Sequence, residues 1–171
     1  MKRRDRVRRV LILCSHFLRN LAFYRAGWRR RVAIRKTQFF WVTANGNFLD
    51  HCVLEWCKLF ADDRGKHHWR KVVTDQDNFI AGLLNSVRLT VVEFQAYADE
   101  MRRYRDKFIA HLDLDEVMYI PKLRLARQCV TYLYEHVLAN EDDGDFFPEA
   151  PLRAARFYQL FANEARGVYA E

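Results

Sequence analysis

The sequence predicts an all-α protein that folds as an up-and-down bundle of about five to six helices. Glycine and proline are scarce, at 6 and 3 among 171 residues, whereas a fold of many short strands needs frequent turn residues. Apolar residues recur along most of the chain at steps of three and four, the spacing of one helix face. Half of the residues are hydrophobic, which excludes a disordered chain and supplies the core of a single domain over residues 1–171.

The N-terminal helix is expected over residues 6–31 and is strongly basic. Residues 1–36 hold thirteen Lys or Arg residues and one Asp, a net charge of +12, whereas the other 135 residues carry −5. We expect this basic N-terminal helix or arm to attract RNA or DNA, because arginine suits bidentate contacts with phosphate. The alternatives are a solvated helix face and pairing with an acidic run made of Glu141, Asp142, Asp143 and Asp145.

Four further helices are expected in the central segment, residues 37–139. They span residues 37–61, 75–86, 90–110 and 121–139. The sequence Asn45-Gly46-Asn47 is expected to break or kink the first of them, because these residue types favour turns. The remaining segment, residues 140–171, begins with an acidic loop, and a last helix is expected over residues 151–167.

Helix starts are signalled by specific residues. Asp75 or Asp77 is expected as an N-cap, and Thr90 with Glu93 has the form of a capping box. Pro121 and Pro151 suit the first turn of a helix, because proline has a fixed φ and lacks the N–H that would be unpaired there.

The chain is expected to be cytoplasmic and without membrane contact. Ser15, His16 and Arg19 interrupt the apolar run 10–13, so a signal peptide is not expected, and no stretch reaches the roughly eighteen apolar residues of a membrane span. The cysteines are expected to be free buried thiols in a reducing compartment: Cys14, Cys52, Cys57 and Cys129.

The residues best suited to chemistry lie near the end of the helix expected over residues 90–110. An apolar seam along that helix is most simply core: Phe94, Tyr97, Met101, Tyr104 and Phe108. Polar groups interrupt it at Arg105, Asp106 and His111. Arginine can hold a phosphoryl group by two hydrogen bonds, histidine can transfer protons near neutral pH, and a carboxylate can orient either. Such a set suffices for RNA cleavage in which the 2′-hydroxyl attacks its own phosphate. The alternative is an ordinary helix end with a capping histidine.

Spacing limits what one helix can do here. Arg105 and His111 are six residues apart, which on a regular helix is about 600° of rotation and about 9 Å of rise. The two side chains would point roughly 120° apart and could not hold one phosphate. Either the helix ends before His111, or two copies of the chain bring their motifs together across a two-fold axis.

The motif resembles the R-x(4–6)-H motif of the HEPN superfamily, which has a polar residue directly after the arginine. Here it reads Arg105, Asp106, four residues and His111, within the sequence RDKFIAHLD. The stretches 47–60 and 67–69 are also similar to HEPN domains of prokaryotic abortive-infection systems, and the resemblance covers about residues 40–140. It implies a HEPN-like core over residues 37–139.

The resemblance also implies a function. Many HEPN proteins are homodimeric, metal-independent ribonucleases of toxin–antitoxin or phage-defence systems, so RNA, a second copy and an antitoxin or other protein are the expected partners. Arg105 would stabilise the transition-state phosphate, His111 would be the general acid or base, and Asp106 would orient its neighbours. Tyr104 and Lys107 are weaker candidates for RNA contact. Neither a metal nor a cofactor is expected.

His67 and His68 are the other notable polar residues. They are expected either to line the cleft beside the motif and contact RNA, or to cap a helix at the surface. A zinc site with Cys52 and Cys57 is not expected, because Cys-x4-Cys on a helix does not place both thiolates on one face. Two hypotheses follow for the protein: a metal-independent HEPN-type endoribonuclease, or a non-catalytic HEPN-like module that binds a nucleotide, RNA or protein partner.

Overall fold

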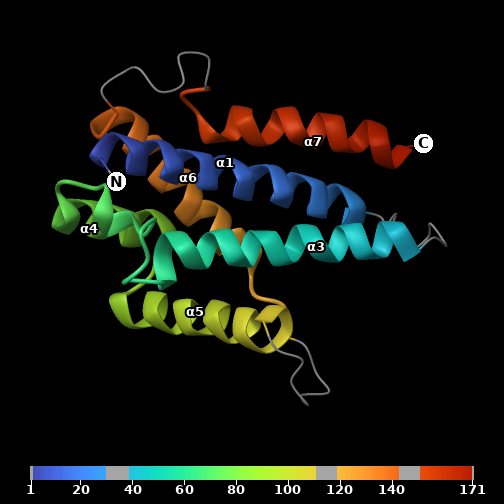
Figure 1. Cartoon of the computed structure of the whole chain (residues 1–171), viewed down its shortest axis with the longest axis horizontal. Helices are drawn as coiled ribbons and strands as arrows, with labels where there is room; N and C mark the ends of the chain where they lie inside the picture. Colours follow the sequence, from blue (N-terminus) through green and yellow to red (C-terminus); the bar gives the residue numbers. More distant parts are fainter. Residues whose placement is uncertain (1, 30–38, 111–118, 143–150, 171) are drawn as a thin grey trace.

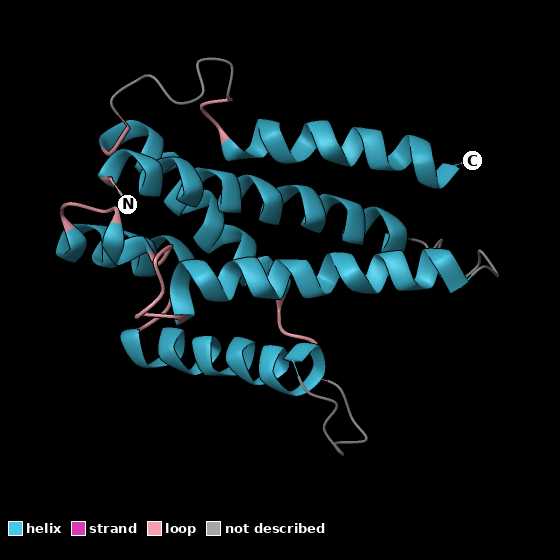
Figure 2. Ribbon diagram, in the orientation of Figure 1, coloured by secondary structure: helices cyan, strands magenta, loops and turns pink. Residues whose placement is uncertain are grey.

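The computed structural model describes residues 2–29, 39–110, 119–142 and 151–170. These residues form six α-helices and no strand, which confirms the predicted all-α bundle (Figures 1 and 2). The helices are α1 (Arg3–Trp28), α3 (Phe39–Trp56), α4 (Gln76–Val87), α5 (Val91–Tyr104), α6 (Leu123–Asn140) and α7 (Ala154–Ala170). Two π-helical segments, η2 (Cys57–Ala61) and η4 (Arg105–Ala110), directly continue α3 and α5, and a 3-10 turn, η3, spans Trp69–Lys71.

Helix α1 is the central helix of the bundle. It packs against α3, α6 and α7, and Figure 1 shows it between α7 and α3. Its buried side chains follow the predicted three- and four-residue spacing: Val7, Val10, Leu11, Cys14, Phe17, Leu18, Leu21 and Ala22. Basic residues such as Arg4, Arg8 and Arg9 occupy its exposed face. The basic segment thus supplies a large part of the core on one side of the helix and positive charge on the other.

One acidic residue of the run 141–145 meets this basic helix. Glu141 is buried just past the end of α6, and its carboxylate forms an ion pair with Arg3. It also accepts a hydrogen bond from the backbone N–H of Thr74 at 2.7 Å. The predicted alternative of pairing between the basic and acidic segments therefore occurs at this residue, while residues 143–150 lie outside the described part of the chain.

The predicted break at Asn45-Gly46-Asn47 is wrong, because α3 runs through these residues as a continuous helix. Asn45 is buried, and α1 approaches α3 closely at Gly27. A Cβ atom at Gly27 would lie 2.6 Å from the hydroxyl oxygen of Tyr169 and would also contact the Asn45 amide oxygen. Tertiary packing around Asn45 thus outweighs the weak helix propensity of this tripeptide.

The predicted caps of α4 and α5 are confirmed. The Asp75 side chain accepts the N–H of Asn78 at 3.1 Å. Thr90 and Glu93 form a complete capping box, in which each side chain accepts the other residue's backbone N–H. Helices α6 and α7 begin at Leu123 and Ala154, two and three residues after the prolines expected to lie in their first turns.

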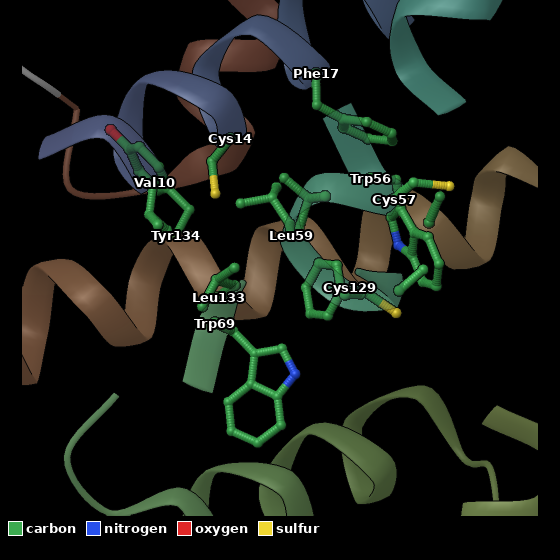
Figure 3. Close-up of a cluster of buried hydrophobic side chains, with 14 of the residues drawn as sticks. Val10, Cys14, Phe17, Trp56, Cys57, Leu59, Trp69, Cys129, Leu133 and Tyr134 are labelled. Carbon is green, nitrogen blue, oxygen red and sulfur yellow. The ribbon is translucent and has the colours of Figure 1, made fainter. Parts of the chain in front are cut away.

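The core lies where α1, α3, η2 and α6 meet. Figure 3 shows Trp56, Cys57 and Leu59 beside Cys129 and Leu133 of α6. All four cysteines are free and buried, as predicted. Burial raises the pKa of both Cys57 and Cys129 to about 12, so these thiols stay protonated at neutral pH. Within the described residues, no helix combines the length and apolar character needed to cross a membrane.

Candidate functional site

The motif begins where α5 changes from an α-helix into a π-helix. Tyr104 is the last α-helical residue, and Arg105 to Ala110 form η4. A π-helical turn holds one residue more than an α-helical turn, and such turns are frequent at functional sites. The segment Arg105–Ala110 therefore departs from the regular α-helix for which the roughly 120° separation was calculated, and the relation between Arg105 and His111 stays a prediction. His111 lies outside the described residues.

Two carboxylates hold the Arg105 guanidinium. Its Nη1 donates to Asp62 Oδ1 at 2.7 Å, and its Nε donates to Asp106 Oδ1 at 2.8 Å. Hydrogen bonding to Asp106, followed by that to Asp62, raises the pKa of Arg105 above its usual value. The Arg105 side chain is 22% exposed, so solvent still reaches it. Asp106 thus makes the contact that an orienting role requires.

A second arginine of α5 contacts the same neighbour. Arg102 lies one turn before Arg105, and its Nε and Nη2 donate to the carbonyl oxygen of Ala61 at 3.2 and 2.6 Å. Ala61 ends η2 and Asp62 follows it directly, so the two arginines bind adjacent residues at the C-terminal end of η2. The sequence did not identify Asp62 or Arg102 as part of the site, although two consecutive acids after a long apolar helix were a usable signal.

Tyr104 anchors α5 to α3. Its side chain is buried, and its hydroxyl donates to Asp50 Oδ1 at 3.0 Å. Burial raises the pKa of Tyr104 and the pKa of Asp50 above their ordinary values. At Asp50 the hydrogen bond from Tyr104 lowers the pKa, but by less than burial raises it. Tyr104 is 3% exposed, which leaves little surface for the predicted RNA contact. Its position indicates that it fixes the register of the helix carrying Arg105.

Lys107 is half-buried and lines a cavity of about 600 Å³ beside α5. The other lining residues are Ala96, Asp99, Glu100, Arg103, Tyr104, Phe108 and Tyr119. Two acids and two bases contribute charge to this lining, so it has no excess of either sign. Within the motif, Lys107 thus lines this cavity, whereas Arg105 binds Asp62.

His68 is part of the core. Its Nε2 lies 3.1 Å from both the Phe60 carbonyl oxygen and Asp63 Oδ1, and its Nδ1 accepts the backbone N–H of Arg70 at 3.4 Å. Burial lowers the pKa of His68, which favours the neutral ring that accepts at Nδ1 and donates at Nε2. His68 is the N-cap of η3, so the capping role occurs, but it occurs in the core and not at the surface as expected.

His67 lies beside His68 in sequence but in a different environment. It is half-buried, and burial together with the nearby charges of Arg9 and Lys58 lowers its pKa. Neither histidine contacts Arg105 or Asp106 directly. His68 is linked to the motif only by the loop that contains Asp62, the partner of Arg105.

The described residues include no group of three His, Cys, Asp or Glu placed to hold a metal ion.

Comparison of the chain with known proteins finds no matching family model, no matching curated protein and no matching solved structure.

Proposed function

We propose that the protein is a metal-independent endoribonuclease of the HEPN type, with a site built from Arg105, Asp106 and His111 of two copies. The observation that supports it best is the placement of Arg105 at a π-helical turn, partly exposed and held by two carboxylates. A guanidinium held in one orientation is suited to stabilise charge that develops on a phosphate, because little reorganisation is needed during the reaction. The resemblance of the RDKFIAH sequence to the HEPN motif supplies the role of His111.

The proposed reaction cleaves RNA by internal attack. The 2′-hydroxyl oxygen bonds to the adjacent phosphorus, and the bond from phosphorus to the 5′ oxygen of the next nucleotide breaks. His111 transfers a proton, as the base that takes it from the 2′-hydroxyl or the acid that gives one to the 5′ oxygen. The products are a 2′,3′-cyclic phosphate and a 5′-hydroxyl.

The Arg105 guanidinium keeps donors for a phosphate. Nη1 and Nε bind Asp62 and Asp106, and Nη2 has no hydrogen-bond partner among the described residues. Arginine carries five N–H donors. An incoming phosphate can therefore accept from Nη2 while Asp62 and Asp106 hold Nη1 and Nε.

Product analysis and subunit mixing test this proposal. RNA incubated with the protein and EDTA is expected to give 2′,3′-cyclic phosphate ends. Arg105→Gln and His111→Ala are each expected to be inactive, whereas mixing and re-equilibrating the two variants restores cleavage, because one intact composite site forms in a mixed dimer. Products with 3′-hydroxyl ends, or no cleavage by the wild type, would refute the proposal.

The second candidate is a non-catalytic HEPN-like module that binds a nucleotide, RNA or a protein such as an antitoxin. One observation favours it: Arg102 and Arg105 bind adjacent residues at the end of η2, which gives Arg105 a role in stability without any substrate. This candidate predicts binding without turnover. Wild-type RNA binding that weakens with salt, combined with intact RNA after long incubation, would favour it over the ribonuclease.

A further inference from the structure

A second polar groove lies away from the motif, between α1, α4 and α6. Its volume is about 520 Å³, within the range of small-molecule sites. Three arginines line it, Arg25 from α1 and Arg124 and Arg127 from α6. The other lining residues are Ser86, Gln128, Thr131, Tyr132 and Glu135. The groove thus combines positive charge with neutral hydrogen-bonding groups.

These three arginines have no ion-pair partner among the described residues, unlike Arg3, Arg102, Arg105 and Arg153. Glu135, the one acid in the lining, already accepts the N–H of Ala154 at 3.2 Å and lies 3.4 Å from Arg153. The positive charge of the groove is therefore not neutralised from within the described part of the chain.

Arg127 is held in place by packing. Its guanidinium lies over the ring of Tyr158 of α7, 3.9 Å from the ring centroid. A guanidinium stacked on a ring keeps its N–H edges free for hydrogen bonds in its own plane. Arg127 is thus fixed in position while its donors remain available to a ligand.

The arrangement is electrostatically unfavourable without a ligand. Arg124 and Arg127 lie in the first two turns of α6, where the helix dipole is positive, and the first turn of α6 contains no acid. Burial lowers the pKa of Arg127, and the charge of Arg25 lowers it further. A bound anion would offset the repulsion between these cations.

We propose that this groove binds the phosphate group of a small phosphomonoester through Arg25, Arg124 and Arg127. The groove lining carries a net charge of +2, which matches the charge of about −2 on a phosphate monoester near neutral pH better than the single charge of a phosphodiester. Gln128 and Thr131 can donate to further oxygens of the ligand. This site is separate from the motif, and the proposal does not depend on ribonuclease activity.

Calorimetric titration of the full chain with AMP tests the proposal, with adenosine as the probe that lacks the phosphate. AMP is expected to bind and adenosine is not. Arg124→Gln and Arg127→Gln should each weaken AMP binding at least about tenfold, because each removes a charge-assisted hydrogen bond. Arg124 is exposed, so its variant tests the site even if Arg127→Gln disturbs the packing on Tyr158.

A control variant establishes whether AMP binding depends on this groove. Arg156→Gln removes an exposed arginine of α7 that does not line the groove, and should bind AMP as the wild type does. The AMP titration requires no cleavage, so a failure of the ribonuclease proposal would not affect this result. A twelve-uridine RNA is titrated as a further probe. The proposal would be overturned if AMP does not bind, or if only the RNA binds. It would also be overturned if the Arg124→Gln and Arg127→Gln variants bind AMP as tightly as the wild type does.

Discussion

Arg105 of η4 donates from Nη1 to Asp62 at 2.7 Å, which joins the end of α5 to the first residue after η2. The partners are 43 residues apart in sequence. Because the contact forms within one chain, the position of Arg105 is set by the fold of that chain and not by bound RNA. The two π-helical segments are therefore parts of one structural unit, and changes at either end should affect the motif.

Removing the charge of Asp62 should strengthen RNA binding at Arg105. Asp62→Asn keeps a side-chain oxygen that can accept from Nη1 but removes one negative charge beside the phosphate position. Affinity for a short single-stranded RNA, measured by fluorescence anisotropy, should rise roughly twofold to tenfold. The free energy of unfolding should fall by no more than about 1 kcal/mol, because the pair is partly exposed.

The control is Asp77→Asn, which removes the same charge at an exposed position on α4. It should leave RNA affinity within twofold of the wild type. Equal affinity gains in both variants would show that overall charge, and not the surroundings of Arg105, determines RNA binding.

Two glycines should respond to alanine in opposite ways. Gly27→Ala places a Cβ atom 2.6 Å from the Tyr169 hydroxyl oxygen, so unfolding free energy should fall by roughly 1–3 kcal/mol. Gly46→Ala places its Cβ where no heavy atom lies within 4 Å, on the exposed side of α3, and should add about 0.5–1 kcal/mol. Urea denaturation measures both, and a destabilised Gly46→Ala would contradict the continuous helix at this position.

The capping box at Thr90 should contribute measurably to stability. Thr90→Ala removes the oxygen that accepts the Glu93 N–H at 3.2 Å, and should lower the unfolding free energy by about 1 kcal/mol. Thr90→Ser keeps that oxygen and should recover most of the loss. A Thr90→Ser variant as unstable as Thr90→Ala would assign the effect to the methyl group and not to the cap.

Stability should decrease as the pH falls from about 7.5 to 5.5. Burial lowers the pKa of His68 in the folded chain, whereas an exposed histidine in the unfolded chain titrates near about 6.5. Below that value the unfolded chain binds more protons, so unfolding becomes easier. His68→Asn should flatten this dependence and should lower stability at pH 7.5 by roughly 1–3 kcal/mol, because the polar atoms of Phe60 and Arg70 lose their partner.

The control for this pH dependence is His51→Asn, at an exposed position of α3. Denaturation curves at several pH values should give the wild-type slope for this variant. A His68→Asn slope equal to that of the wild type would show that other groups cause the dependence.

Local signals in the sequence predicted most of the fold. The helical class, the α4 N-cap at Asp75 and the capping box at Thr90 depend on residues close together in the chain, and the structure confirms them. The break expected at Gly46 failed because burial of Asn45 is a tertiary effect. The apolar spacing predicted a helix in the basic N-terminal segment, but no local pattern revealed that this helix, α1, is the central one.

The candidate site was only partly predictable for the same reason. The pairing of Arg105 with Asp106 follows from adjacency in sequence, whereas its pairing with Asp62 joins distant segments. The π-helical turn at Arg105 and the burial of Tyr104 and His68 also depend on packing. The structure thus places Arg105 in a π-helical segment and buries Tyr104 and His68, two of the expected RNA contacts.

Cleavage of RNA in the presence of EDTA tests the proposed ribonuclease activity most directly. Wild type, Arg105→Gln, His111→Ala and the exposed-surface control Arg156→Gln would be compared at equal concentration, with folding of each checked by circular dichroism. We expect cleavage by the wild type and Arg156→Gln, and at least about a hundredfold loss in Arg105→Gln and His111→Ala. Equal cleavage by all four proteins, or none by the wild type, would contradict the proposed activity.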